Sequence, residues 1–243
     1  MNHVGKWQRG FTLIELMLAM AFVSTLLLAI AMIIVQIGSI YNKGITYTDV
    51  NSAGSSIASE LQRSINESTP FNIDPAKGTS LYVDKTWGGR LCTNRYSYIW
   101  NYGKALQSPK NPSRNVYSDD TDIRFVKALD PSNGYCTASA SPVKKATAVE
   151  ILDAGQHDLV IHSFKISSGN PSDIVNSAAD GSTGQQLYSI IFTIGTNDPT
   201  ALKSDDPNPG DVSCKLPNEF NANPLYCTIS RFNLTARAGN EAK

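Results

Sequence analysis

The sequence predicts an α+β protein in which one long N-terminal helix precedes a mostly antiparallel β-sheet with long loops. Three observations support this fold class. An apolar run fills residues 16–40, an apolar stripe at helical spacing follows it, and alternating apolar side chains occur at 188–194. The first two observations predict a helix and the third predicts strands, because side chains repeat every 3.6 residues in a helix and every two in a strand.

The predicted helix covers residues 11–66. Its C-terminal part, here called the outer part, carries apolar residues three and four positions apart, which is typical of an amphipathic helix. These residues are Val50, Ala53, Ile57, Leu61 and Ile65. No proline interrupts residues 11–65, and Pro70 disfavours helix at the residue before it. Gly38, Gly44 and Gly54 are expected to weaken the helix, by about 1 kcal/mol each relative to Ala.

The inner part of this helix is long enough to cross a membrane. Residues 16–40 would span roughly 37 Å at 1.5 Å per residue, which exceeds the hydrocarbon core of about 30 Å. Lys6 and Arg9 precede the apolar run and predict a cytoplasmic N-terminus, with an extracytoplasmic domain at 67–243. A cleaved secretory signal ending at Ala29-Ile30-Ala31 is the competing interpretation. It is disfavoured because the apolar run continues beyond that point.

Four cysteines, Cys92, Cys136, Cys214 and Cys227, all follow the apolar run. An even number of cysteines on one side of a membrane segment indicates disulfides in an oxidising compartment. Of the three pairings, Cys92–Cys136 with Cys214–Cys227 keeps the loops short and is favoured. Zinc binding is disfavoured because the chain has no C-x-x-C pair and no histidine near the cysteines.

Strands are predicted in the C-terminal part of the chain from alternating side chains. One strand places Tyr188, Ile190, Phe192 and Ile194 on a single face. A second strand, at 158–166, is expected to turn Val160, Phe164 and Ile166 inward. Shorter strands are expected at 123–126 and 228–234, with long polar loops at 167–186 and 195–213.

An aromatic stretch flanked by cations offers a candidate ligand site. Tyr96, Tyr98, Trp100 and Tyr102 alternate along one predicted strand, and Arg90, Arg95 and Lys104 lie around it. Aromatic side chains interleaved with cations can bind DNA bases or sugar rings, so Arg90, Arg95, Trp100 and Lys104 are candidate ligand residues. The favoured interpretation is that this aromatic face packs in the core.

Other chemistry has weaker signals. Calcium is considered at the acidic loop containing Asp198, Asp205, Asp206 and Asp211, but without EF-hand spacing solvated acids are favoured. His157 and His162 have no evident catalytic partner, and no common catalytic motif is present. We therefore expect no enzyme activity, no catalytic residue, no metal and no cofactor. The balance of 21 basic and 21 acidic residues gives no argument for nucleic acid as an overall partner.

Residues 6–16, KWQRGFTLIEL, combine a short basic leader ending in Gly10 with Phe11, Glu15 and a following apolar helix. This combination resembles the class III signal of type IV prepilins. Residues 56–66, SIASELQRSIN, are similar to the end of the first helix in minor pilins and J-class pseudopilins. The resemblance implies a pilin-like fold, a leader at 1–10, cleavage between Gly10 and Phe11 by a prepilin peptidase, and N-methylation of Phe11.

The resemblance also implies a structural role in a filament. In this family, the acid at the Glu15 position is thought to pair with the N-terminal amine of a neighbouring subunit. Such a pair would offset the cost of two charges in hydrocarbon. A Glu15 that extends to the lipid headgroups is the simpler alternative. The expected partners are other pilins or pseudopilins, the prepilin peptidase, an inner-membrane assembly platform and membrane lipid.

Two features favour a minor subunit. Many major pilins carry a proline in the second half of the apolar segment, where this chain reads Ala31-Met32-Ile33, and this chain is longer than most major pilins. The CKLPNEFNANPLYC loop between Cys214 and Cys227 resembles the C-terminal disulfide loop of many pilins. The resemblance leaves open a pilus, a secretion pseudopilus or a DNA-uptake filament, with adhesion as one role. The alternative function is a single-pass anchored binding module or adhesin that does not polymerise.

Overall fold

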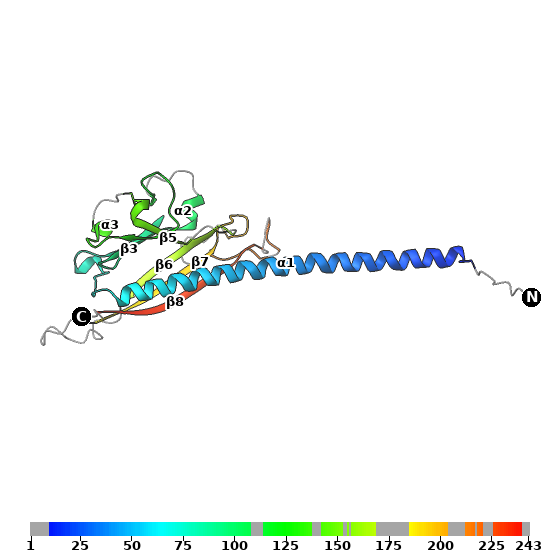
Figure 1. The fold of residues 1–243 in the computed structure, drawn as a ribbon, viewed down its shortest axis with the longest axis horizontal. Helices are drawn as coiled ribbons and strands as arrows, with labels where there is room; N and C mark the ends of the chain where they lie inside the picture. The colour runs from blue at the N-terminus through cyan, green and yellow to red at the C-terminus, as the bar shows by residue number, and fades with distance from the viewer. Residues whose placement is uncertain are drawn as a thin grey trace, which may run out of the picture. The chain divides into compact units, whose positions relative to one another are not determined.

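The computed structural model describes residues 10–107, 114–137, 142–152, 155, 157–168, 185–203, 212–216, 218–220 and 226–239. The chain forms two compact units, residues 1–42 and 43–243. Helix α1, Leu13–Asn66, contributes its inner part to the first unit and its outer part to the second. Figure 1 shows α1 and the strands of the second unit.

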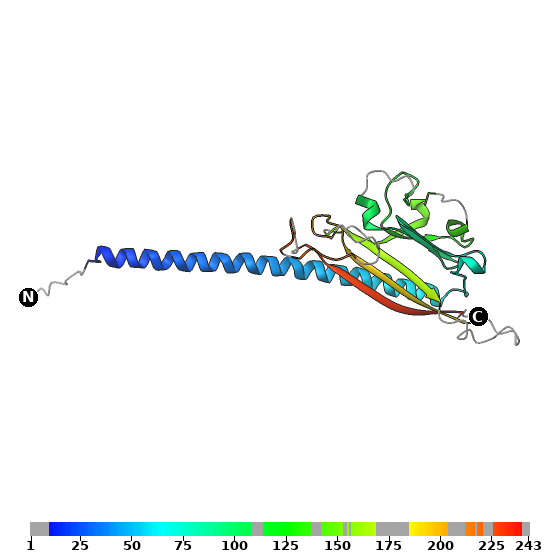
Figure 2. The same cartoon turned by 180° about the vertical axis from the view of Figure 1, so that it is seen from behind.

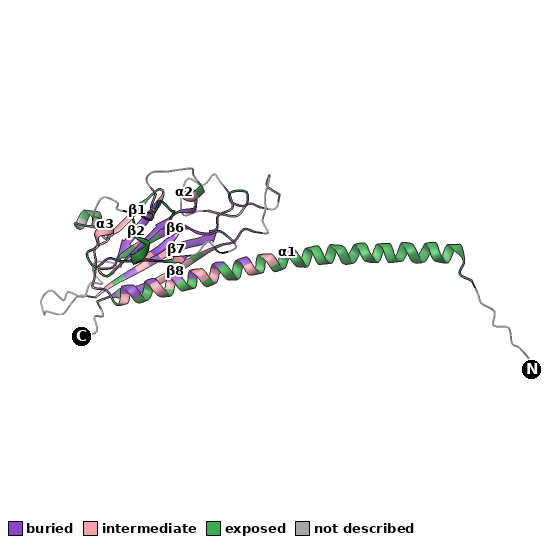
Figure 3. Ribbon diagram, turned by 45° about the horizontal axis from the view of Figure 1, so that its top comes forward, coloured by how far each residue is buried: buried purple, intermediate pink, exposed green. Residues whose placement is uncertain are grey.

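The two parts of α1 differ in burial. Every residue from Leu13 to Gly38 is exposed. In the outer part, Val50, Ile57 and Leu61 are fully buried, which confirms the predicted amphipathic stripe. Figure 3 shows this change along the helix, with buried positions only in its outer part. One helix thus carries two patterns, because only its outer part has a protein surface to pack against.

The second unit contains two antiparallel sheets where the sequence predicted one. The first has the order β1-β2-β3-β4-β5, and its strands are Tyr82–Lys85, Gly88–Cys92, Tyr96–Asn101, Phe125–Leu129 and Ala148–Leu152. The second has the order β6-β7-β8, and its strands are Leu159–Ser168, Gln186–Thr196 and Ile229–Ala238. A parallel bridge joins Tyr102, just after β3, to Ile161 of β6. The short helices are α2 (Gly103–Gln107), α3 (Gly134–Thr137), η1 (Pro75–Lys77) and η2 (Lys145–Thr147).

The stripe of α1 and both sheets share one core. Trp100 of β3 packs on Phe164 of β6, with ring centroids 4.3 Å apart, and Phe164 stacks on Phe192 of β7 at 6.0 Å. The four predicted inward residues of β7 are all fully buried, as their alternation predicted. Aromatic contacts of this kind therefore hold the two sheets together.

Strand β6 departs from the predicted alternation. The register of β6 on β7 shifts between Ile161 and Ser163, as in a β-bulge. Because a bulge inserts one extra residue, the inward phase changes at this point. Leu159 and Ile161 therefore share the main core with Phe164, whereas Val160, predicted to face it, is buried outside that cluster.

Strand β8 approaches the outer part of α1 closely, and Figure 2 shows the two side by side. The Gln62 side chain donates to the Thr235 carbonyl at 3.2 Å, and the Arg237 N–H donates to Asn66 at 3.1 Å. A Cβ on Gly54 would lie only 2.0 Å from the Phe232 ring. Gly54 is therefore a packing position, although the sequence suggested only a weak point in the helix.

Candidate functional site

The N-terminal segment singled out by the sequence lies immediately before α1. Phe11 is 84% exposed, and nothing lies within 4 Å of the position that a Cβ on Gly10 would occupy. The predicted cleavage point between Gly10 and Phe11 is therefore exposed. The leader residues Lys6 and Arg9 lie outside the described residues.

Thr12 and Glu15 form a reciprocal capping arrangement at the start of α1. The Thr12 N–H and hydroxyl donate to Oε2 of Glu15 at 2.9 and 2.8 Å, and the Glu15 N–H donates back to the Thr12 hydroxyl at 3.3 Å. This is a capping box, which satisfies backbone donors that the first turn leaves free. The Thr-Leu-Ile-Glu spacing is a sequence signal for it that the sequence analysis did not use.

The inner part of α1 carries the apolar surface of the first unit. Within the described residues, α1 is the helix long and apolar enough to cross a membrane, and its most apolar window has no residue buried in the protein. An exposed apolar surface of this length is compatible with a single-pass membrane anchor.

The four candidate ligand residues do not share a surface. Trp100 is fully buried in the core, as the packing interpretation predicted. Arg90 is 6% exposed and donates to the Asn115 side chain at 2.9 and 3.0 Å and to the Tyr135 carbonyl at 2.9 Å. Burial lowers the pKa of Arg90. Neither side chain is therefore accessible to an external ligand.

Arg95 and Lys104 are both exposed, but they lie beyond opposite ends of β3. A strand of six residues is about 20 Å long, so the two cations flank it without meeting. A DNA or glycan site built on these four residues therefore has no support from their positions.

The cysteines pair as the short-loop arrangement predicted. Cys92 is bonded to Cys136 with a Cα–Cα distance of 6.2 Å, and Cys214 to Cys227 at 5.8 Å. The first bond holds α3 beside β2, and the second closes a loop before β8.

The acidic loop considered for calcium is described only in part. The Asp198 carboxylate accepts from the Thr200 N–H at 2.8 Å and the Thr200 hydroxyl at 2.7 Å, which is a local turn. Asp205, Asp206 and Asp211 lie outside the described residues, so calcium there stays a prediction. Among the residues that the structure places, no three His, Cys, Asp or Glu side chains form a group that could hold a metal.

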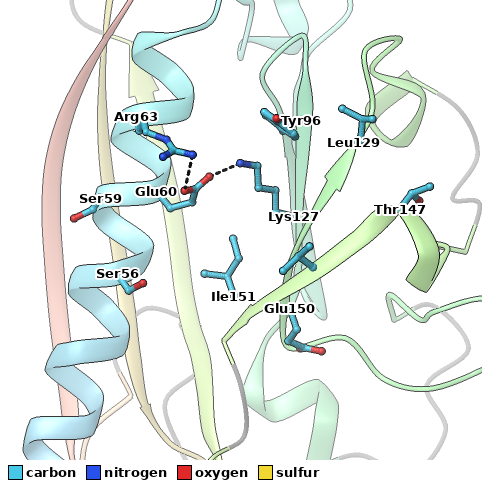
Figure 4. A pocket seen from close by; sticks show the side chains of 11 residues that line it. Ser56, Ser59, Glu60, Arg63, Tyr96, Lys127, Leu129, Thr147, Glu150 and Ile151 are labelled. Atoms are coloured by element: carbon cyan, nitrogen blue, oxygen red, sulfur yellow. Dashed lines mark hydrogen bonds and ion pairs between the residues drawn. The ribbon is translucent and has the colours of Figure 1, made fainter.

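A groove between α1 and the first sheet is the second candidate site of the molecule. The main cavity has a volume of about 820 Å³. Helix α1 lines it with Ser56, Ser59, Glu60 and Arg63, and the sheet side contributes Tyr96, Lys127, Leu129, Thr147, Val149, Glu150 and Ile151 (Figure 4). We call it the α1–β5 groove. It is lined by four segments that are distant in the chain, so no local sequence pattern could predict it.

The charged side chains in the groove converge on Glu60. Its carboxylate accepts from Lys127 Nζ at 2.5 Å, and Arg63 lies 3.7 Å away on its other side (Figure 4). The Tyr98 hydroxyl also donates to Glu60 at 3.2 Å. Burial, with the nearby Glu60 carboxylate, raises the pKa of Tyr98, so this hydroxyl stays protonated as a donor. Lys127 Nζ also lies 3.8 Å from the centre of the Tyr96 ring, a cation–π contact.

A smaller cavity of about 320 Å³ continues the groove along α1. It shares Ser56 and Ile151 with the main cavity and reaches Asp49 and His157. The stretch of α1 from Asp49 to Arg63 would be about 21 Å long at 1.5 Å per residue. The α1–β5 groove is therefore long enough for a chain segment as well as for a small molecule.

No protein-family model, no curated protein and no solved structure matches this chain.

Proposed function

We propose that the chain is a minor pilin or pseudopilin, cleaved after Gly10 and assembled through the inner part of α1 into a type IV pilus or related filament. One observation carries the proposal. The Gly10-Phe11 junction lies just before α1 and Glu15 lies in its first turn, and the residues of α1 from Leu13 to Gly38 are all exposed and mostly apolar.

The physical argument concerns the charges at the start of this helix. An exposed apolar helix must be covered by lipid before assembly and by neighbouring helices after it. Cleavage at Gly10 would give Phe11 a positive amine close to Glu15. In hydrocarbon both charges are costly, so pairing each with a neighbouring subunit would favour assembly of cleaved chains.

The other parts of the proposal follow from this role. The partners are other pilins or pseudopilins, the prepilin peptidase and an inner-membrane assembly platform. The chain begins as a single-pass cytoplasmic-membrane protein with its N-terminus inside, and residues 67–243 are extracytoplasmic. It acts as a structural protein, without an enzymatic reaction of its own.

The mass of the purified chain tests the processing step. We expect the mass of residues 11–243 with one added methyl group. A Gly10→Val variant should keep the leader while forming the same two disulfides. A chain that still begins at Met1, or that begins at Met32, would contradict the proposal.

Two substitutions of Glu15 separate its charge from its capping role. Glu15→Gln removes the charge but keeps an amide that can complete the capping box, whereas Glu15→Ala removes both. We expect both variants to enter the membrane and neither to be recovered in sheared filaments. Normal incorporation of Glu15→Gln would show that capping, and not charge pairing, is what Glu15 supplies.

A membrane-anchored binding module is the second candidate function, and the α1–β5 groove is the observation that favours it. In that case the groove would bind the ligand, and the inner part of α1 would serve only as an anchor. Such a chain would keep its leader, so the same mass measurement distinguishes the two functions.

A further inference from the structure

We propose that the second unit has a lipid-contact surface of its own, at the end where α1 enters it, and that this surface rests on the headgroups of the bilayer that α1 crosses. It is formed by exposed apolar side chains, namely Tyr47 of α1 and Leu216, Phe220 and Tyr226 of the segment before β8. We call these residues the entry patch. The proposal rests on the membrane anchor of the proposed function, but not on cleavage or polymerisation.

The contacts between α1 and β8 give the position of the entry patch. Gly54 lies against Phe232, and the Asn66 side chain accepts from the Arg237 N–H, so residue numbers increase in the same direction along both elements. The segment before β8 therefore lies at the end of the unit where α1 enters, as Figures 1 and 2 both show. Tyr47 precedes Gly54 by about two helical turns, so it lies on the side of α1 that faces β8.

Large apolar side chains are concentrated in the entry patch. Phe220 is 89% exposed, Tyr47 58%, Leu216 54% and Tyr226 43%. In the rest of the described second unit, the other large apolar side chains that are exposed are Leu129, Val149 and Leu187. An exposed apolar surface at one end of a protein is typical of a region that lipid or another apolar surface covers.

The segment that carries Leu216 and Phe220 is fixed by its own contacts. The Leu216 N–H donates to the Glu219 carboxylate at 2.9 Å, and the Glu219 N–H donates back to the Leu216 carbonyl at 2.9 Å. Leu202 and Cys227 are buried in a small core of the same region, next to the second disulfide. The folded segment therefore buries some of its apolar side chains and holds Leu216 and Phe220 outside that core.

The position of this end along the chain favours lipid as the partner. The predicted apolar run ends at Ile40, and the second unit begins at Lys43, about 4.5 Å farther along a helix. The end that carries the entry patch therefore begins within about one helical turn of the hydrocarbon boundary. The run is also longer than the hydrocarbon core is thick, at roughly 37 Å against about 30 Å, so tilting of α1 would bring one side of this end closer to the headgroups.

The side chains of this end suit the boundary between lipid and water. Tyrosine is enriched at that level because its ring is apolar and its hydroxyl is polar, and the entry patch contains Tyr47 and Tyr226. In the described parts of residues 198–226, both carboxylates have partners: Glu219 pairs with Lys203 at 3.0 Å, and Asp198 accepts hydrogen bonds in a local turn. Lipid contact would therefore bury apolar side chains beside carboxylates that are already hydrogen-bonded.

The test places single tryptophans in the full-length chain, reconstituted in phosphatidylcholine bilayers with and without lipids brominated close to the headgroup. Bromine quenches tryptophan fluorescence only at short range, so the loss reports contact with lipid. We expect Phe220→Trp to lose roughly half or more of its added fluorescence, because its ring would lie among the headgroups. Leu129→Trp places the same probe at an exposed apolar position of the first sheet and should lose almost none. The unsubstituted chain supplies the background from the native tryptophans.

A second measurement tests whether the patch residues act together. Tyr47→Trp should also be quenched, and adding Leu216→Ser with Phe220→Ser should reduce that quenching, because the unit would then be held less closely to the headgroups. Adding Val149→Ser with Leu187→Ser makes the same kind of change at other exposed positions and should leave the quenching unchanged. All of these positions are exposed, so the fold should be retained.

Leu26→Trp, in the inner part of α1, separates this proposal from the membrane anchor. Lipids brominated deep in the acyl chains should quench it. If they do, and Phe220→Trp is quenched no more than Leu129→Trp, the lipid contact is wrong and the anchor stands. If Leu26→Trp is not quenched, the anchor and the lipid contact are both wrong. Self-association that Leu216→Ser with Phe220→Ser abolishes, together with an unquenched Phe220→Trp, would assign the entry patch to a second copy of the chain instead.

Discussion

Two opposing effects act at Gly54, its low helix propensity and its packing against β8. In a helix, glycine costs about 1 kcal/mol relative to alanine, which suggests a weak point. The structure gives the position a packing role, because a Cβ there would lie 2.0 Å from the Phe232 ring. Close approach of β8 to α1 therefore outweighs helix propensity at this residue.

We predict that Gly54→Ala destabilises the second unit by about 1 to 3 kcal/mol, the usual cost of overpacking a core. Gly44→Ala is the matched control, since nothing lies within 4 Å of its Cβ position, and it should stabilise by about 0.5 to 1 kcal/mol. Urea unfolding in detergent, followed by tryptophan fluorescence, measures both. A stabilising Gly54→Ala would contradict the packing role, and Phe232→Leu should relieve part of its cost.

His162 makes stability depend on pH. It is buried in β6, its Nε2 lies 3.1 Å from the Thr196 carbonyl, and burial lowers its pKa to about 4. Above about pH 6.5 the ring is neutral in both the folded and the unfolded chain. Below that pH the unfolded chain binds a proton that the folded chain excludes, so stability is lost as the pH falls.

We predict that the free energy of unfolding decreases by up to about 1.4 kcal/mol per pH unit between about pH 6.5 and 4 because of this residue. His162→Gln keeps a side-chain donor for the Thr196 carbonyl but does not titrate, so its slope should be smaller over the same range. Urea unfolding at a series of pH values gives both slopes. Identical slopes would remove His162 as the cause.

At the scale of elements, the two disulfides close loops of different length. Cys92–Cys136 has a sequence separation of 44 and Cys214–Cys227 a separation of 13. In the chain-entropy model, a cross-link stabilises more when it closes a longer loop. The first disulfide should therefore contribute more to the stability of the second unit.

We predict that replacing Cys92 and Cys136 by serine costs about 4 kcal/mol, and that replacing Cys214 and Cys227 costs about 3 kcal/mol. Urea midpoints of the two double variants, measured without reductant, test the order. A larger loss from the shorter loop would show that native contacts around Cys214 and Cys227 outweigh loop entropy.

The elements also show where sequence patterns succeed and fail. The bounds of α1, its buried stripe and the inward face of β7 follow from local periodicity, so each could be predicted. The division into two sheets and the bulge at His162 depend on which strands pair, and pairing joins distant parts of the chain. Local alternation therefore could not place Val160 correctly.

At the scale of the whole chain, the apolar part of α1 and the disulfides together lead to a prediction about the redox state of the cysteines. If the N-terminus stays in the cytoplasm, all four cysteines reach an oxidising compartment and become protected from alkylation. We expect no gel shift with a polyethylene-glycol maleimide unless reductant is added. Replacing Lys6 and Arg9 by glutamate should weaken this orientation and expose free thiols. Full protection in that variant would show that these two charges do not set the orientation.

The candidate sites also differ in whether they could be predicted from the sequence. The sequence by itself determined the N-terminal features, because Gly10, Phe11, Glu15 and the apolar run are neighbours in the chain and their chemistry needs no fold. It also determined the amphipathic stripe and favoured the cysteine pairing that the structure has. Only the tertiary structure decided that Arg90 and Trp100 are buried, and that Arg63, Lys127 and Val149 share one groove. Burial, and contacts between segments that are distant in the chain, arise from tertiary packing. A local sequence pattern therefore cannot predict them.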